Sequence, residues 1–411
     1  MYRVHHGLPV SQQGDAGGRR ANGLLIERVS PQDWEEIVDW DEAVAESASP
    51  SIFLTRDWIS AWWDSFGAGL NPWLLRVADR DARTIGIAPL YVGRLRVGAR
   101  RVGVLGDQVV GSEYLGIAAR SGAEAEVADA VSGWLADAQP RWHIAEFRGL
   151  RKGDPAAGAL ELAVRDESSK AEVEEEPCSA IELPTDFEEL LAGLRSKFRQ
   201  SYRQRTNKLL RTCEVRFFPT ESEAELREHL ETLFSLHQRR WTEAQRLGAF
   251  ADPRMRRFYD DVSRRLLRSG SLRFWHLEVD GAIRASQFAF VYDGVLHSLQ
   301  EAYDMDFSAP GIGGLGVVLR GHVLRSAIEE GLRSYDFLGG AEDHKLRWGA
   351  SIHSIRHLTV ARGGVPGLAG WLETAGVAAV RGSLKEALPD SVLERLRATR
   401  ATLKRRRART G

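Results

Sequence analysis

Three side chains of the types used in acid–base chemistry fall at alternate positions of one predicted strand. His297, Glu301 and Tyr303 lie within residues 296–303, and every second residue of a strand points to the same face, about 7 Å apart. A carboxylate in a partly apolar pocket has a raised pKa, so we predict Glu301 as a general base. Tyr303 is the predicted proton donor to a leaving group, and His297 is a third catalytic candidate. The alternative is that these groups only pair across the sheet.

A glycine-rich run lies a few residues after this strand and opens a predicted helix over residues 316–330. The run is Gly311-Ile312-Gly313-Gly314-Leu315-Gly316, and unpaired amides at a helix N-terminus bind phosphate. The letters also match the dinucleotide fingerprint, with Asp336 as its acidic residue. A dinucleotide fold needs the first glycine directly after a parallel strand, whereas residues 305–310 intervene here and tight hairpins precede them. We therefore favour a phosphate loop of another kind.

Basic residues gather in the segment before the second group of strands. Seven positive charges and no negative one lie from Arg195 to Arg211. A helical wheel places Arg205 in the apolar sector, where a guanidinium must pair with a structural carboxylate or meet a substrate anion. Lys345 follows a Gly-Gly turn and either holds an acceptor phosphate or carboxylate or lies on a solvated face. The predicted substrate-binding residues are Arg205, Arg239, Arg240, Trp241, Asp336 and Lys345.

The two halves of the chain repeat one order of elements. Strands predicted at 271–279, 285–292 and 296–303 are joined by Asp-Gly turns, and a helix and the strand 334–338 follow. The first half has strands at 73–78 and 85–92, a helix at 127–138 and a strand at 142–149. Between them, helices are expected from Thr185-Asp186 to Leu209 and along 226–241, and Trp58, Trp62, Trp63 and Phe66 are expected in the core. We predict a duplicated, mixed α/β unit.

The boundary between the repeats is expected in the acidic stretch 166–177. The predicted organisation is a disordered leader (1–23), an N-terminal domain (24–177), a C-terminal domain (178–362) and a helical basic tail (363–411).

Composition excludes several classes of protein. The 411 residues are 43% hydrophobic and 27% charged with a net charge of −1, which argues against collagenous, wholly disordered and integral-membrane chains and against DNA as a partner. Two cysteines make no disulfide framework, and the first 23 residues lack the apolar core of a signal peptide, so we expect a cytoplasmic protein. His353 and His357 have no supporting acid, and no metal site is expected.

The C-terminal end carries a concentrated positive charge. Eight basic residues and no acid fall within residues 395–411. Residues 393–407 form a predicted basic amphipathic helix, which either contacts anionic membrane lipid peripherally or is a solvated terminus.

Several motifs in this order resemble the CelD and FemAB/FemX-like type of the GNAT superfamily. In the second half they are Glu301-Ala-Tyr-Asp304, Ser308-Ala-Pro-Gly311, Tyr335-Asp-Phe-Leu-Gly-Gly340 and Lys345-Leu-Arg-Trp-Gly349. Upstream, the basic helix 197–211, His237-Gln-Arg-Arg-Trp241, Ala88-Pro89-Leu90 and Ser112-Glu-Tyr114 also resemble that family. The resemblance implies two tandem GNAT-like domains, each a mixed and largely antiparallel sheet flanked by helices. It also implies that residues 311–316 hold the pyrophosphate of an acyl donor.

The resemblance suggests transfer of an acyl group from acyl-CoA, as co-substrate, to an amine. The expected acceptor is an amino sugar, an amino acid or a cell-envelope or polysaccharide precursor. In the Fem branch the donor is aminoacyl-tRNA, and the basic helix would then hold tRNA phosphates. A non-catalytic scaffold in polysaccharide biosynthesis is the alternative outside the enzymes.

Overall fold

The computed structural model describes residues 19–21, 23–165, 169–243, 248–307 and 314–374, without the side chains of 19–21, Gln108 and 240–243. The predicted leader and the basic tail beyond residue 374 therefore lie almost entirely outside the described residues, as do Gly311, Ile312 and Gly313.

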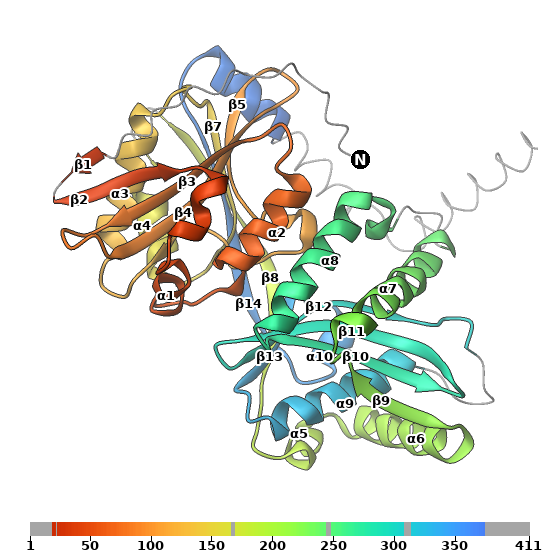
Figure 1. Cartoon of the computed structure of the whole chain (residues 1–411). Coiled ribbons are helices and arrows are strands. Elements are labelled where there is room, and N and C mark those ends of the chain that lie inside the picture. Colours follow the sequence, from red (N-terminus) through yellow and green to blue (C-terminus); the bar gives the residue numbers. More distant parts are fainter. Residues whose placement is uncertain (1–18, 22, 166–168, 244–247, 308–313, 375–411) are drawn as a thin grey trace, which may run out of the picture.

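A single mixed sheet runs through both halves of the described chain. Its 14 strands follow the order β1-β2-β3-β4-β5-β7-β14-β8-β13-β12-β11-β10-β9, with β6 beside β4. Neighbouring strands are antiparallel except for β5 with β7 and β12 with β13. The expected mixed, largely antiparallel sheet flanked by helices is thus confirmed (Figure 1).

The first half supplies the strands β1 (Arg19–Ala21), β2 (Leu24–Val29), β3 (Asn71–Ala78), β4 (Thr84–Arg94), β5 (Arg100–Val104), β6 (Ala118–Ala119) and β7 (Ile144–Arg151). Its helices are the 3-10 turns η1 (Pro31–Glu36), η2 (Ile52–Leu54) and η3 (Gln108–Val110), and α1 (Trp40–Ala45), α2 (Arg56–Phe66), α3 (Glu124–Asp137) and α4 (Pro155–Ala163).

The second half contains the strands β8 (Lys170–Glu182), β9 (Val215–Pro219), β10 (Leu272–Val279), β11 (Ala282–Tyr292), β12 (Val295–Tyr303), β13 (Ser334–Gly339) and β14 (Ser351–Ala361). Its helices are α5 (Phe187–Gly193), α6 (Ser196–Thr212), α7 (Glu223–Glu243), η4 (Ala249–Ala251), α8 (Pro253–Arg268), α9 (Leu315–Glu329) and α10 (Asp343–Leu346). Figure 1 shows α7 and α8 on one face of this part of the sheet, and α5, α6 and α9 on the other.

The Asp-Gly turns form as predicted. Asp280 and Gly281 have φ values of 50° and 75°, and Asp293 and Gly294 have 45° and 68°. Two consecutive positive φ angles match the right-handed twist of a two-residue hairpin, and Asp and Gly tolerate them. These turns fix the antiparallel order β10-β11-β12.

One local prediction needs correction. The helix expected from Thr185-Asp186 to Leu209 is broken at Leu194 and Arg195, whose ψ values of 155° and 131° are not helical, so that α5 and α6 are separate helices. The acidic stretch in which the boundary is expected is strand from Lys170, because its backbone pairs with β14 along residues 351–361.

The two halves share strands and an aromatic core. β14 follows the second half in sequence but pairs with β7 of the first half on one side and β8 on the other. Trp58 of α2 packs against Phe258 of α8 and Phe290 of β11, with ring centroids 5.2 and 5.3 Å apart. The expectation that Trp58, Trp62 and Phe66 are core residues is confirmed by their burial. The predicted boundary at residues 177 and 178 falls inside β8 and stays a prediction.

The last described helical segment, residues 365–374, packs on the first half through Trp371, which contacts Ile144 and Ala361. Among the described residues, no helix combines the length and apolarity needed to cross a bilayer.

Candidate active site

The parallel strands β12 and β13 separate after three residue pairs. Val295, Leu296 and His297 pair with Ser334, Tyr335 and Asp336, and the register with β13 stops there. β12 nevertheless continues to Tyr303 while paired with β11 on its other side. Residues 298–303 therefore have no strand partner in β13 among the described residues, and an unpaired strand edge of this kind can bind an extended ligand arm.

A β-bulge at Leu299 changes which side chains of β12 share a face. The register with β11 passes from His297–Phe290 and Ser298–Ala289 to Gln300–Phe288, which leaves Leu299 without a partner. One extra residue reverses the alternation. His297 therefore faces Phe53 and Phe290, whereas Glu301 faces Arg320 of α9. The prediction that His297, Glu301 and Tyr303 line one face is wrong for this reason.

The N-terminus of α9 meets a cation from α6. Gly314, the N-cap of α9, has φ 80° and ψ 43°, a left-handed conformation that suits glycine. The guanidinium of Arg205 lies directly over Gly314, where a Cβ atom would collide with its Nη1. Arg205 is exposed on α6 and does not point into the apolar core as the wheel predicted. Free amides of the first helical turn and a guanidinium thus converge on one point, an arrangement suited to phosphate.

Tyr303 and Tyr202 fix the geometry around this point. Tyr303 Cδ1 lies 3.0 Å from where a Cβ of Gly316 would stand, so the end of β12 packs against the first turn of α9. Tyr202 of α6 packs against Gly321 of α9 in the same way, and its ring lies 5.3 Å from that of buried Trp348. The structure therefore brings together Tyr303, Gly314, Leu315, Gly316 and Arg205.

Glu301 is held by a buried arginine. Arg320 Nε donates to Glu301 Oε1 at 2.9 Å, and Nη2 donates to Oε2. Tyr335 Oη lies 3.5 Å from Oε1 and accepts from Gln287 Nε2 at 2.6 Å. Burial would lower the pKa of Arg320, but the negative charge of Glu301 raises it. A carboxylate in a bidentate ion pair is a poor proton acceptor, so the geometry disfavours Glu301 as a general base.

A cluster of polar side chains lies on the face of the sheet opposite to α9, where the two halves meet. Tyr114, from the loop after β5, donates from its hydroxyl to Asp336 Oδ2 at 2.7 Å and lies 2.8 Å from His353 Nε2. His297 Nδ1 is 3.7 Å from the same carboxylate oxygen. Burial would raise the pKa of Asp336, but His297 and Tyr114 lower it. Asp336 is 5% exposed and internally paired, which argues against the predicted substrate contact.

Glu113, next to Tyr114, is a buried carboxyl group at the same junction. A Cβ on Gly339, at the end of β13, would stand 2.8 Å from Glu113 Oε1. The residue is 7% exposed, and its Oε2 has no hydrogen-bond partner among the described residues. Burial, with the nearby carboxylates of Glu176 and Asp336, raises the pKa of Glu113 to about 8, although Lys345 lowers it. This pKa suits proton exchange near neutral pH.

In the first half, the gap between the parallel strands β5 and β7, which corresponds to that between β12 and β13, is filled by a loop. β5 and β7 pair in parallel only at Arg101–Ile144 and Val102–Ala145. Beyond that point Leu115 forms a parallel bridge with Leu150, and its amide donates to Gly149 O at 2.9 Å. The loop that carries Glu113 and Tyr114 therefore fills its own gap and extends to β13 of the second half.

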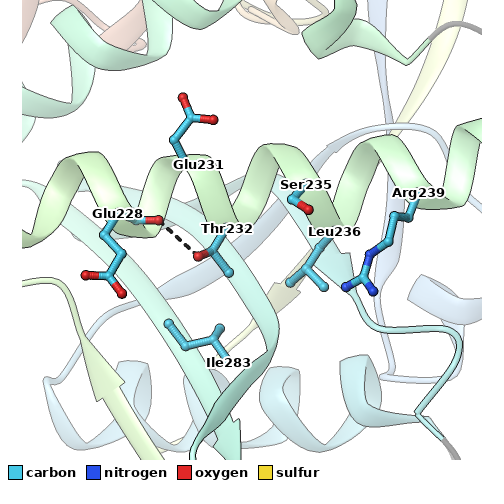
Figure 2. Close-up of a pocket in the computed structure, with 7 residues that line it drawn as sticks. All are labelled: Glu228, Glu231, Thr232, Ser235, Leu236, Arg239 and Ile283. Carbon is cyan, nitrogen blue, oxygen red and sulfur yellow. Dashed lines mark hydrogen bonds between the residues drawn. The ribbon is translucent and has the colours of Figure 1, made fainter.

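Arg239 of α7 lies beside a hollow between α7 and β11. The hollow has a volume of about 320 Å³ and is lined by Glu228, Glu231, Thr232, Ser235, Leu236, Arg239 and Ile283 (Figure 2). Arg239 is also 3.8 Å from Asp304, which Arg284 holds at 2.8 Å. The role of Arg239 in substrate binding stays a prediction. Arg240 and Trp241 lie on α7, but their side chains are outside the described residues.

Lys345 has an internal role in place of the predicted substrate contact. Its ammonium group donates to Gly339 O and lies 3.0 Å from Glu342 Oε2. Lys345 is 9% exposed, so these contacts occupy it. Within the described ranges, no group of three or more His, Cys, Asp or Glu side chains is arranged to hold a metal ion.

The sequence assigns no role in the site to Glu113, Tyr114 or Arg320. The run Ser112-Glu113-Tyr114 contributes only to the family resemblance. Its contact with β13 depends on long-range packing, including a 2.9 Å hydrogen bond from Trp58 Nε1 to Ser112 Oγ.

Comparisons with known proteins agree with this geometry. Residues 196–346 match the family model of the acetyltransferase (GNAT) domain. The structure of FemX superposes with a TM-score of 0.57 at 11% identity and covers 81% of this chain and 96% of FemX. A conserved protein of unknown function from Bacteroides thetaiotaomicron VPI-5482 has a TM-score of 0.54 at 14% identity, covering 82% and 99% of the two chains. No curated protein matches the sequence significantly.

The separating parallel strands and the helix behind them lie within residues 196–346, the part of the chain that matches the acetyltransferase (GNAT) domain. The fold of the chain is similar to that of FemX over most of its length.

Proposed function

We propose that the protein is an N-acyltransferase that uses acyl-CoA and acylates an amine of an amino sugar, an amino acid or a cell-envelope precursor. The observation that carries the proposal is the position of Arg205 over the N-terminus of α9, beside the unpaired edge of β12. The pyrophosphate of coenzyme A would bind at Gly314–Gly316 and Arg205, and its pantetheine arm would follow residues 298–303. Amides of the bulged strand are candidate donors to the thioester carbonyl oxygen.

The acceptor would approach from the face that bears Glu113, Tyr114 and His297. This assignment separates the two substrates: the phosphates lie at the α9 N-terminus, and the amine lies at the junction of the halves. Tyr303, which packs on Gly316, remains the proposed proton donor to the leaving thiolate.

The test is a panel of acyl-CoA donors with primary amines, followed by release of free thiol. Arg205→Ala should raise the KM for the donor by about 10-fold or more, the size expected for losing a charged hydrogen bond. Arg203→Ala is the matched control on α6, because Arg203 pairs with exposed Glu188. Equal donor KM values for the two variants would contradict the proposed phosphate site.

Aminoacyl-tRNA is the second candidate donor. α6 and the residue before it expose six cations, namely Arg195, Lys197, Arg203, Arg205, Lys208 and Arg211. A strand of tRNA would contact several of them, and log affinity would then fall steeply with log salt concentration. The donor affinity should be measured at about 50 and about 200 mM salt. A similar affinity at both concentrations would favour acyl-CoA over aminoacyl-tRNA.

A further inference from the structure

The loop of residues 111–117 carries a carboxyl group into a place where one of its oxygens has no hydrogen-bond partner among the described residues. The loop closes the gap of the first half through Leu115, so it has no donor-binding edge of its own. It instead places Glu113 against Gly339 at the end of β13. Only a glycine allows this approach, because a Cβ at residue 339 would stand 2.8 Å from Glu113 Oε1.

The carboxyl group is unsatisfied where it lies. Glu113 Oε2 is buried without a hydrogen-bond partner among the described residues. A buried polar atom without a partner is costly, and a ligand that supplies the partner removes this cost. Lys345, whose charge lowers the pKa of Glu113, is already bound to Gly339 O and Glu342.

The charges around Glu113 favour a cation as the missing partner. Glu176 of β8 and Asp336 of β13 add two further carboxylates, against the single ammonium group of Lys345 on α10. Cys178 of β8 also lies near Glu113, and burial raises the pKa of its thiol, so it remains uncharged. The local field is therefore negative, and the 7% exposure of Glu113 admits only a slender group.

We propose that Glu113 binds the primary ammonium group of the acceptor at the junction of the two halves. This inference rests on the proposed function and names the acceptor class as a primary alkyl amine on an unhindered carbon. The first half would thus supply the acceptor site, and the second half the donor site.

This contact determines how protons move during acyl transfer. The bound ammonium group passes one proton to the Glu113 carboxylate, and the neutral nitrogen attacks the acyl carbonyl carbon. The C–N bond forms, the C–S bond breaks with its electron pair on sulfur, and a second proton moves from nitrogen to the thiolate. The first transfer returns Glu113 to the protonated form that it holds in the free protein, where burial and the nearby carboxylates raise its pKa.

The experiment is isothermal titration calorimetry of the full chain with n-butylammonium chloride at pH 7, in two buffers of different ionisation enthalpy. Free Glu113 is largely protonated at this pH, so wild type should release nearly one proton for each amine bound. Glu113→Gln should bind at least 10-fold more weakly and release none. Gly339→Ala keeps the charge but displaces the carboxyl group, and it should also bind at least 10-fold more weakly.

Asp343→Asn is the matched control, because Asp343 is 79% exposed and pairs with Arg347 on α10. This variant should bind n-butylammonium with wild-type affinity and release the same number of protons. Tetramethylammonium, which has no N–H group, should not bind to the wild-type protein. Equal amine affinity in wild type and Glu113→Gln, or binding without proton release, would overturn the proposal. Coenzyme A binding in the same variants separates the two ideas: its absence in wild type refutes the donor proposal and leaves the amine result intact.

Discussion

Tyr202 of α6 packs its ring into the space that a side chain on Gly321 of α9 would occupy. One turn further along α6, Arg205 lies over Gly314 at the start of the same helix. The glycine inside α9 therefore sets how closely α6 approaches, and so where the guanidinium stands relative to the free amides. Small shifts of such a group have large effects on binding, because hydrogen bonds depend steeply on distance and angle.

Gly321→Ala should move α6 away from α9 and weaken donor binding. We expect a donor Kd at least about 10-fold higher, comparable with the loss of one charged hydrogen bond. Overpacking should also lower the free energy of unfolding by about 1–3 kcal/mol. Calorimetric titration with coenzyme A and urea denaturation measure the two effects. Gly133→Ala, in α3 with open space around it, is the control: it should leave coenzyme A binding unchanged and raise the free energy of unfolding by at most about 1 kcal/mol.

Glu301→Gln distinguishes a structural carboxylate from a general base. The change leaves Arg320, 5% exposed, without a charged partner, and we expect a loss of about 3 kcal/mol in unfolding free energy. Adding Arg320→Met should recover part of this loss, because the double variant buries no unpaired charge. Turnover by the folded Glu301→Gln enzyme should fall less than about 10-fold. A wild-type stability with a fall of about 100-fold in turnover would instead support the general base.

Glu113 should make the protein less stable as the pH rises from 6.5 to 8. Its pKa of about 8 in the folded state exceeds the ordinary 4.5, so the folded protein holds a proton that the unfolded chain has lost. Stability from this group is complete below pH 4.5 and is lost as pH rises through the folded value. Between pH 6.5 and 8 the loss is about 2 kcal/mol. Urea denaturation of Glu113→Gln should show a flatter profile in this window, and an unchanged slope would refute the assignment.

His276 should have the opposite effect in acid. Its imidazole is buried between Thr220 and Ser286, and burial together with His229 lowers its pKa to about 2 from 6.5. The unfolded chain binds a proton below pH 6.5 that the folded protein does not. Stability therefore falls by about 1.4 kcal/mol for each pH unit below 6.5 and is unaffected above it. His276→Gln should reduce this slope in urea titrations between pH 6.5 and 5, and a slope equal to that of wild type would contradict the prediction.

The hairpins and the helix after the glycine run were predictable because they depend on neighbouring residues. Asp280-Gly281 and Asp293-Gly294 favour their turns locally, and α9 lies within a residue of its expected bounds. The bulge at Leu299 has no such signature, since Leu and its neighbours suit a regular strand equally well. Strict alternation therefore placed His297 on the same face as Glu301 and Tyr303, whereas only the latter two share a face.

The contacts between the two halves could not be predicted from neighbouring residues in the sequence. Glu113 meets Gly339, and Tyr114 meets Asp336, only after β8 and β14 have brought the two halves into one sheet. The basic helix was found from its charges, but the direction of Arg205 depended on how α6 and α9 pack. The sequence thus locates the donor side of the site better than the acceptor side.

The last strand of the described sheet lies between strands of the first half and the segment that links the halves. A gene fragment ending near residue 177 would encode β7 without the neighbour that covers its edge, and a fragment starting near 178 would leave much of β14 without a β8 to pair with. Neither fragment would contain both partners of every strand pair, so neither half is expected to form its part of the sheet alone. We therefore expect the two halves to fold as one unit.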